Sequence, residues 1–190
     1  MPRPLPPWPA TPPAHGAIVL REVGLRDLDM VRELSTDPYI AQTGTLQADA
    51  DGAHARAWID RQSARRDEGV GFSFAMADEA TGDAVGHCGL WLTELGQGRA
   101  TAGYVVAPSA RGHGYAADAL AALTAFAATV PGLHRVALFI EPWNAASIRT
   151  AERAGYEREG LLRSYVTIGD QRCDMLVYAT VLHSGGSGHP

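Results

Sequence analysis

The segment from residue 100 to residue 141 constrains the fold more than any other part of the chain. An apolar strand pattern, ATAGYVVAP, precedes a loop with two glycines and a long helical pattern, YAADALAALTAFAAT, and a second apolar strand, RVALFIE, follows at residue 135. A strand, a helix and a further strand in this order form a parallel crossover, because the helix returns across one face of the sheet. The segment therefore predicts an α/β domain.

The other patterns extend this unit into a sheet of mixed direction. Strand patterns also cover residues 17–23, 70–77, 84–92 and 173–181, and helical spacing of apolar residues covers 25–35, 49–68 and 144–155. The turn residues of DEATGD, at 78–83, predict an antiparallel hairpin between two of the strands. We expect a central mixed sheet of about six or seven strands flanked by about four helices.

The two ends of the chain differ in composition from the rest. Residues 1–16 hold seven of the 12 prolines, which predicts an extended, flexible N-terminal tail that contributes little to a core. Residues 183–190, HSGGSGHP, have the composition of a flexible C-terminal tail. We therefore expect one domain over residues 17–182, a normal size for a single core.

Charge and composition exclude several classes of protein. The net charge is −5, and all 16 basic residues are arginine, so a nucleic-acid-binding protein is not favoured. The two cysteines, Cys88 and Cys173, are too far apart in the sequence to suggest a CxxC metal site or a disulfide framework. We therefore expect no metal site. No stretch is apolar for long enough to predict a leader or a membrane helix, so we expect a cytoplasmic protein.

The loop SARGHGYAADAL, at residues 109–120, is open to several interpretations. A Walker A loop requires a lysine, and this chain has none. The stretch GHGYAA satisfies the dinucleotide fingerprint GxGxxG/A, but five residues separate it from Val106 and too little chain follows for a doubly wound sheet. An ordinary glycine-rich entry to a helix is the remaining alternative.

Two linked motifs favour a different interpretation. RGHGYA, at residues 111–116, matches R-x-x-G-x-A, and NAASI at 144–148 and AGYEREG at 154–160 follow at a matching distance. In these motifs the chain resembles the GNAT family of N-acetyltransferases, and most closely its RimJ/RimL-like branch, which acetylates ribosomal-protein N-termini. The resemblance covers nearly the whole domain and implies the GNAT fold.

The resemblance implies acetyl-CoA as the cofactor, with its pyrophosphate on the loop. Free N–H groups at a helix start favour an anion, and glycines let the backbone approach it. Val105 and Val106 are carried over as backbone contacts, although their side chains also suit a core. Asn144 matches the asparagine that binds the cofactor arm, and it also suits a helix N-cap. The cofactor residues of the loop are Arg111, Gly112, His113, Gly114, Tyr115 and Ala116, of which His113 could equally be a solvated loop residue.

The catalytic groups follow less directly from the sequence. Many relatives carry a tyrosine at the position of Ala151 and a glutamate at that of Thr101, and both are absent here. Ser147 is the candidate proton donor to the thiolate, although it could serve only in binding or capping. Glu141 is the candidate general base, with water as the alternative proton acceptor.

The resemblance implies transfer of an acetyl group to a primary amine by direct attack in a ternary complex. The acceptor is a protein N-terminus or a small-molecule amine, and Tyr39 and Trp58 are candidates to line its pocket, with core packing as the alternative. The family also implies a homodimer. A non-catalytic acyl-CoA-binding module is the second hypothesis, because the usual tyrosine and glutamate are missing; a nicotinamide enzyme is the third.

Overall fold

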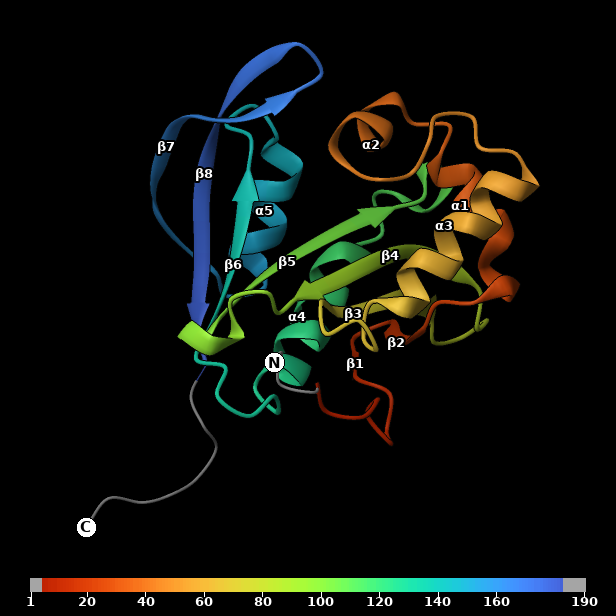
Figure 1. Cartoon of the computed structure of the whole chain (residues 1–190), viewed down its shortest axis with the longest axis horizontal. Helices are drawn as coiled ribbons and strands as arrows, with labels where there is room; N and C mark the ends of the chain where they lie inside the picture. Colours follow the sequence, from red (N-terminus) through yellow and green to blue (C-terminus); the bar gives the residue numbers. More distant parts are fainter. Residues whose placement is uncertain (1–4, 183–190) are drawn as a thin grey trace.

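The computed structural model describes residues 5–182, which form one mixed sheet with helices on both faces (Figure 1). The strands are β1 (Ala14–His15), β2 (Ile18–Glu22), β3 (Gly71–Asp78), β4 (Ala84–Trp91), β5 (Arg99–Val106), β6 (Arg135–Ile140), β7 (Glu157–Ile168) and β8 (Gln171–Val181). The helices are α1 (Leu28–Leu34), α2 (Pro38–Thr43), α3 (Gly52–Ala64), α4 (Tyr115–Ala127) and α5 (Ala145–Arg153).

The strand order in the sheet is β1-β2-β3-β4-β5-β6-β8-β7. Strands β3 and β4 form the expected antiparallel hairpin, and β5 pairs antiparallel with β4. Helix α4 connects β5 to its parallel neighbour β6 as the predicted crossover. The pairing of β5 with β6 covers only three residue pairs, Arg99–Thr101 with Arg135–Ala137. Beyond Thr101 the two strands diverge toward the end of the molecule that carries α2 (Figure 1).

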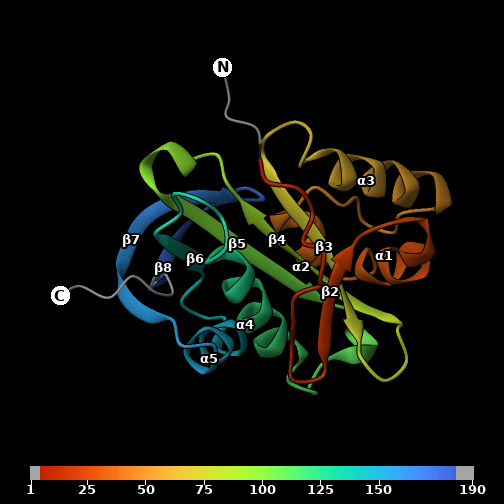
Figure 2. The same ribbon diagram turned by 90° about the horizontal axis from the view of Figure 1, so that it is seen from below.

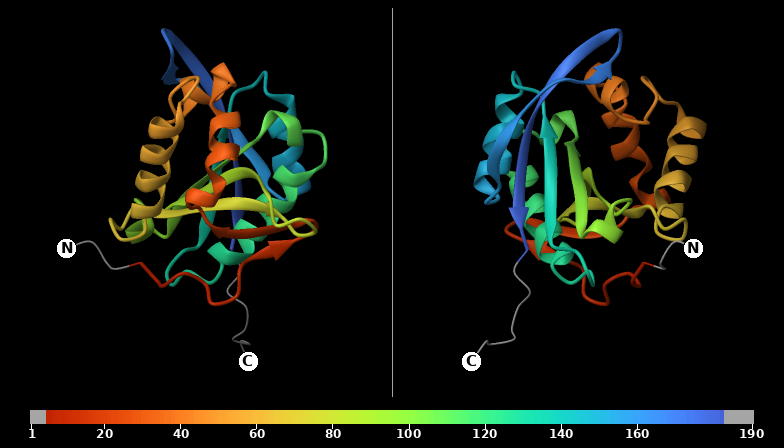
Figure 3. Two further views of the ribbon diagram at one scale, coloured as in Figure 1. Left: turned by 90° about the vertical axis from the view of Figure 1, so that its right-hand side faces the viewer. Right: turned by 60° about the vertical axis from the view of Figure 1, so that its left-hand side comes forward.

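The helices divide into two groups on opposite faces of the sheet. Helices α4 and α5 lie on one face, and α1, α2 and α3 lie on the other, as both views of Figure 3 show. The view from below places α4 directly beneath the strands (Figure 2). Each face has its own apolar cluster, with Phe72, Phe74 and Leu120 on the α4 side and Val31, Leu34 and Trp58 on the α3 side. Alternate residues of the central strands supply the two clusters, as a strand buried on both faces requires.

The described residues contain eight strands and five α-helices, slightly more than the sequence predicted. Helix α2 has only six residues, too few for a helical period, and begins with the Asp37 cap and Pro38. Strand β7 was not predicted, because it is exposed along most of its length and lacks the alternation of apolar and polar residues that marks a half-buried strand. It pairs only with β8, at the edge of the sheet.

The proline-rich N-terminal segment differs from our expectation in its described part. Leu5 is buried, and the Trp8 ring packs edge-on against Phe72 and Phe74, each at 5.2 Å between ring centroids. Arg66 donates a hydrogen bond to the carbonyl of Pro6 at 3.0 Å. The two apolar side chains of this segment, Leu5 and Trp8, therefore belong to the packing of the core. The expected C-terminal tail, residues 183–190, lies outside the described residues.

Across residues 5–182, no helix is long and apolar enough to cross a membrane.

Candidate functional site

The divergence of β5 and β6 opens the sheet beside the glycine loop. From residue 102 to residue 106, β5 pairs with β4 but not with β6, so the main chain on that side is free to bind a ligand. The register of β5 with β4 runs without a shift from Thr101 to Val106. The divergence of the strands alone exposes the backbone of Val105 and Val106.

The loop between β5 and α4 has the predicted backbone. Gly112 has φ +86° and Gly114 has φ +84°, both in the left-handed region that glycine occupies without strain. Gly114 is also the N-cap of α4. Within residues 5–182 the N–H groups of residues 112–116 donate to no protein acceptor. Five free donors at a helix start form a concave site for an anion.

Arg111 is anchored within the loop. Its guanidinium pairs with Asp37, the N-cap of α2, at 2.5 Å, and also donates to the carbonyl of Val106 at 3.3 Å. The hydrogen bond from Arg111 holds the pKa of Asp37 below its ordinary value, so the carboxylate stays ionised. The pair joins α2 to the glycine loop, a connection that the sequence did not predict.

His113 and Tyr115 lie at the rim of the loop. The His113 side chain is exposed and stacks on the Tyr115 ring at 5.4 Å, and His113 is not among the residues that line the neighbouring cavity. Tyr115 lines that cavity, and its hydroxyl donates to Asp78 at 2.6 Å. The structure therefore brings Tyr115, and not the His113 side chain, toward the ligand space.

The cavity beside the loop has a volume of about 620 Å³. Seven of the predicted cofactor residues line it from β5 and the loop, and Asn144 and Ser147 line it from the start of α5. Arg149 and Arg153, one helical turn apart on α5, add two guanidinium groups that the sequence analysis missed. Their i, i+4 spacing directly after NAASI indicates that both lie on one face of the helix, and this pattern could have identified them from the sequence. Phosphate groups of a nucleotide cofactor fit a cavity with this charge.

A second cavity, of about 490 Å³, lies between β4, β5 and the helices α2 and α3. The residues that line both cavities are Tyr39, Ile40, Tyr104, Val105, Asn144 and Ser147. The two cavities therefore meet at the point where β5 leaves β6. Tyr39 and Trp58, the predicted acceptor residues, both line the second cavity, although Trp58 also packs in the core.

Asn144 and Ser147 form the start of α5 at this junction. The Asn144 side-chain oxygen accepts the N–H of Ser147 at 3.0 Å, which is the predicted N-cap and contributes about 1 kcal/mol to the helix. The Ser147 hydroxyl has no hydrogen-bond partner among the described residues and faces the space shared by the two cavities.

Tyr104, which the sequence analysis did not select, reaches the same junction from β5. Its hydroxyl donates to the carbonyl oxygen of Ser147 at 3.2 Å. Burial raises the pKa of Tyr104, so the phenol stays protonated at neutral pH. Tyr104 thus brings a phenol to the first turns of α5, the helix on which many relatives carry a tyrosine at the position of Ala151. The contact joins residues 43 apart in sequence, so no local pattern indicated it.

Glu141 lies at the end of β6 and lines the second cavity. Its side chain is buried, and its two oxygens accept one hydrogen bond each, from the Tyr39 hydroxyl and from the Trp143 indole N–H, the latter at 3.0 Å. Burial and the adjacent Glu141 raise the pKa of Tyr39 far above its ordinary value, so Tyr39 is the donor of that bond. Each carboxylate oxygen retains a further lone pair for a ligand. Glu94, in contrast, is exposed and pairs with Arg99 at 2.9 Å.

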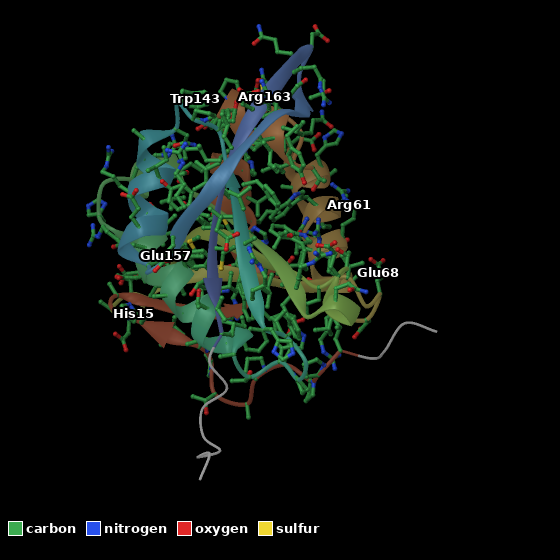
Figure 4. The ribbon with its side chains drawn as sticks, turned by 90° about the vertical axis from the view of Figure 1, so that its left-hand side faces the viewer. His15, Arg61, Glu68, Trp143, Glu157 and Arg163 are labelled. Carbon is green, nitrogen blue, oxygen red and sulfur yellow. The ribbon has the colours of Figure 1, made fainter. Side chains whose placement is uncertain are left out.

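The Trp143 side chain marks the outer limit of this group. Figure 4 places Trp143 at the end of the molecule that carries the β7–β8 hairpin, the opposite end from His15. The Trp143 ring meets that of Tyr39 edge-on at 5.2 Å while 64% of its surface stays exposed. Tyr39 is thus held between Trp143 and Glu141.

Comparisons with known proteins identify a family and similar structures. Residues 17–157 match the model of an acetyltransferase (GNAT) domain. The chain is 26% identical over 162 residues to the N-acetyltransferase p20 of Bacillus licheniformis, covering 85% of this chain and 91% of that protein. It is similar in structure to Mycobacterium smegmatis RimJ in complex with a CoA disulfide, with a TM-score of 0.75 and 26% identity over 94% of this chain and 86% of that one.

The chain also shares its fold with a ribosomal-protein acetyltransferase. RimL, a ribosomal L7/L12 alpha-N-protein acetyltransferase in complex with coenzyme A, gives a TM-score of 0.75 at 17% identity, over 95% of this chain and 99% of that one. The family model covers most of the chain, and the motifs that it shares with the family surround the loop and the two cavities. The chain belongs to the GNAT family of acetyltransferases.

Proposed function

We propose that this protein transfers an acetyl group from acetyl-CoA to a primary amine. The observation that carries the proposal is the junction of the two cavities, one beside an anion-binding loop and the other beside a buried carboxylate. Solved structures of similar fold contain coenzyme A. Residues 112–116 and the arginines at 111, 149 and 153 are suited to its phosphates.

Bound acetyl-CoA supplies an activated acetyl thioester, and the protein must orient it, accept one proton from the amine and return one to the thiolate. The free main chain of Val105 and Val106 is positioned to hold the cofactor arm and to stabilise the developing oxyanion. Asn144 fixes the start of α5, so the hydroxyls of Tyr104 and Ser147 keep their places at the junction. Fixed groups of this kind lower the barrier because they need no reorganisation.

Two hydroxyl groups are candidates to return the proton. Ser147 is the candidate from the sequence, and Tyr104 is the candidate from the structure. A phenol is a stronger acid than an aliphatic alcohol, and Tyr104 keeps its proton at neutral pH. We assign the proton donation to Tyr104 and the positioning of the arm to Ser147. Glu141 accepts the proton of the amine in the second cavity.

The test is release of free thiol from acetyl-CoA with a panel of N-terminal peptides and small amines. With the best acceptor, Tyr104→Phe should lower kcat by about a hundredfold while the Kd for acetyl-CoA changes little. Tyr156→Phe is the matched control, because its buried hydroxyl bonds Thr124 at 2.8 Å outside both cavities. If Tyr104→Phe keeps full activity and Ser147→Ala does not, the assignment is reversed.

The same panel separates the alternative, a non-catalytic acyl-CoA-binding module. That module would bind acetyl-CoA but release no thiol with any amine. The presence of Tyr104 and Glu141 at the junction favours the enzyme, because they supply the acid and the base that the sequence motifs lack.

A further inference from the structure

We propose that the acceptor is an amine that also carries an anionic group, a carboxylate or a phosphate, and that Arg65 binds this group. The inference deepens the proposed function and rests on it, because it assigns the second cavity to the acceptor. It starts from the two ionised side chains that line that cavity.

The two charges of the second cavity lie at different places along the sheet: Arg65 lies over Trp91, which pairs with Thr101, and Glu141 directly follows the end of β6. Among its described lining residues, Glu141 is the one carboxylate and Arg65 is the one guanidinium. Glu141 lies toward the junction, beside Asn144. Arg65, at the C-terminal end of α3, lies above the ring of Trp91, with 5.7 Å between the guanidinium carbon and the ring centroid. A ligand with a positive and a negative end matches this arrangement.

Arg65 forms no ion pair within the described part of the protein. Its side chain is half-buried, yet residues 5–182 give it no side-chain hydrogen bond either. Loss of hydration lowers its pKa, although the nearby Glu68 carboxylate acts to raise it and a guanidinium stays charged at neutral pH. Arg21 and Arg135, in contrast, pair with Asp27 and Glu159 at 2.6 Å. A partly desolvated cation without a partner favours an anionic ligand.

His87 supplies an independent observation. It lines the same cavity and is only 6% exposed, and its Nε2 has no hydrogen-bond partner in the described structure. Trp58 packs edge-on against the ring at 4.9 Å. A buried polar atom without a partner is uncommon in proteins and points to a polar group that the chain itself does not supply. A polar ligand in the cavity could meet this need.

Trp91 lies beneath Arg65 and forms part of the wall of the cavity. Its indole lies over Gly89 and Gly103, and a Cβ at Gly103 would come within 2.9 Å of the ring. The two glycines therefore let the indole lie flat on the sheet. The junction at Val105 lies two strand residues from Gly103 and four from Thr101, which corresponds to roughly 7–13 Å along the strand. The amine and the anion of the acceptor should be separated by a comparable apolar spacer.

The experiment compares pairs of acceptors that differ only in charge. The carboxylate pair is ω-aminohexanoate and ω-aminohexanamide, and the phosphate pair is ω-aminohexyl phosphate and ω-aminohexanol. Glycine is the short probe, in which the amine and the carboxylate are too close together. In the native protein the anionic member of at least one pair should have the higher kcat/KM, by roughly tenfold to a hundredfold, and glycine should be a poor acceptor. The pair with the larger ratio identifies the anion.

The variants locate this preference. Arg65→Gln should bring the ratio within each pair close to one, because it removes the charge that distinguishes the two members. Arg56→Gln is the matched control, because Arg56 lies on the exposed face of the same helix, and it should keep the full ratio. Arg65→Lys keeps the charge without the bidentate geometry and should give an intermediate ratio.

Three results would overturn the proposal: neutral acceptors preferred by the native protein, glycine as good as its longer analogue, or a ratio that survives Arg65→Gln. If no amine is acetylated, the proposed function fails, and binding of the same probes by calorimetry still decides the role of Arg65. The anionic probe should then bind the native protein and lose at least tenfold in affinity in Arg65→Gln. Equal affinity of the anionic probe for the native protein and for Arg65→Gln would refute the proposed role of Arg65.

Discussion

His87 should make the protein sensitive to mild acid. Its imidazole is buried against Trp58, and burial, with a smaller contribution from Arg65, lowers its pKa from 6.5 to about 3. In the unfolded chain the imidazole regains its ordinary pKa, so between these two values the unfolded state binds a proton that the folded state does not. The stability that depends on a neutral His87 is complete above pH 6.5 and decreases as the pH falls toward 3.

The size of the effect follows from the two pKa values. At pH 5 the imidazole of the unfolded chain lies about 1.5 pH units below its pKa, and at 1.36 kcal/mol per unit its protonation stabilises the unfolded state by about 2 kcal/mol. At pH 7 the same contribution is only about 0.2 kcal/mol. His87 alone should therefore reduce the free energy of unfolding by about 2 kcal/mol between pH 7 and pH 5.

The assay is urea unfolding at pH 7 and pH 5 for the native protein and for His87→Gln, which cannot be protonated in this range. Other groups titrate in both proteins alike, so the difference between the two pH dependences isolates His87. The native protein should lose about 2 kcal/mol more than the variant, whatever the variant's stability at pH 7. Equal losses would show that the imidazole is protonated in the folded protein and would refute the reasoning.

Three further changes have expected outcomes. Gly114→Val should weaken acetyl-CoA binding at least tenfold by calorimetry, because valine is strained at φ +84° and the loop must move. Glu141→Gln should lower kcat/KM about a hundredfold at neutral pH and less at alkaline pH, where the amine is already neutral, as a pH–rate profile would show. Trp8→Ala should reduce the free energy of unfolding by about 2 kcal/mol in urea, since its ring packs on Phe72 and Phe74. The homodimer implied by the family stays a prediction for light scattering.

The crossover and the glycine loop could be predicted because their signals are local. Apolar runs of strand length, a long helical period and two glycines before it lie within one stretch of the chain, and each favours the same conformation. The N-cap role of Asn144 was predictable for the same reason, since the cap bonds a residue only three positions away. Local preference and tertiary structure agree at these positions.

The acceptor side could not be predicted because its contacts are distant in sequence. Tyr39 meets Glu141 across 102 residues, and Tyr104 meets Ser147 across 43. In the sequence, Arg65 resembles the other surface arginines of its helix. The structure places it over Trp91, where it lines a cavity. Patterns of hydrophobicity carry no information on such pairings.

The central claim is that the two cavities hold acetyl-CoA and an amine at their junction. Its most direct test is to incubate the protein with acetyl-CoA and the best amine of the panel, and to quantify the acetylated amine by mass spectrometry and the free CoA by thiol titration. Acetylated amine and free CoA should be present in equal amounts at every time point. Free CoA without acetylated amine, or bound acetyl-CoA with neither product, would contradict this claim.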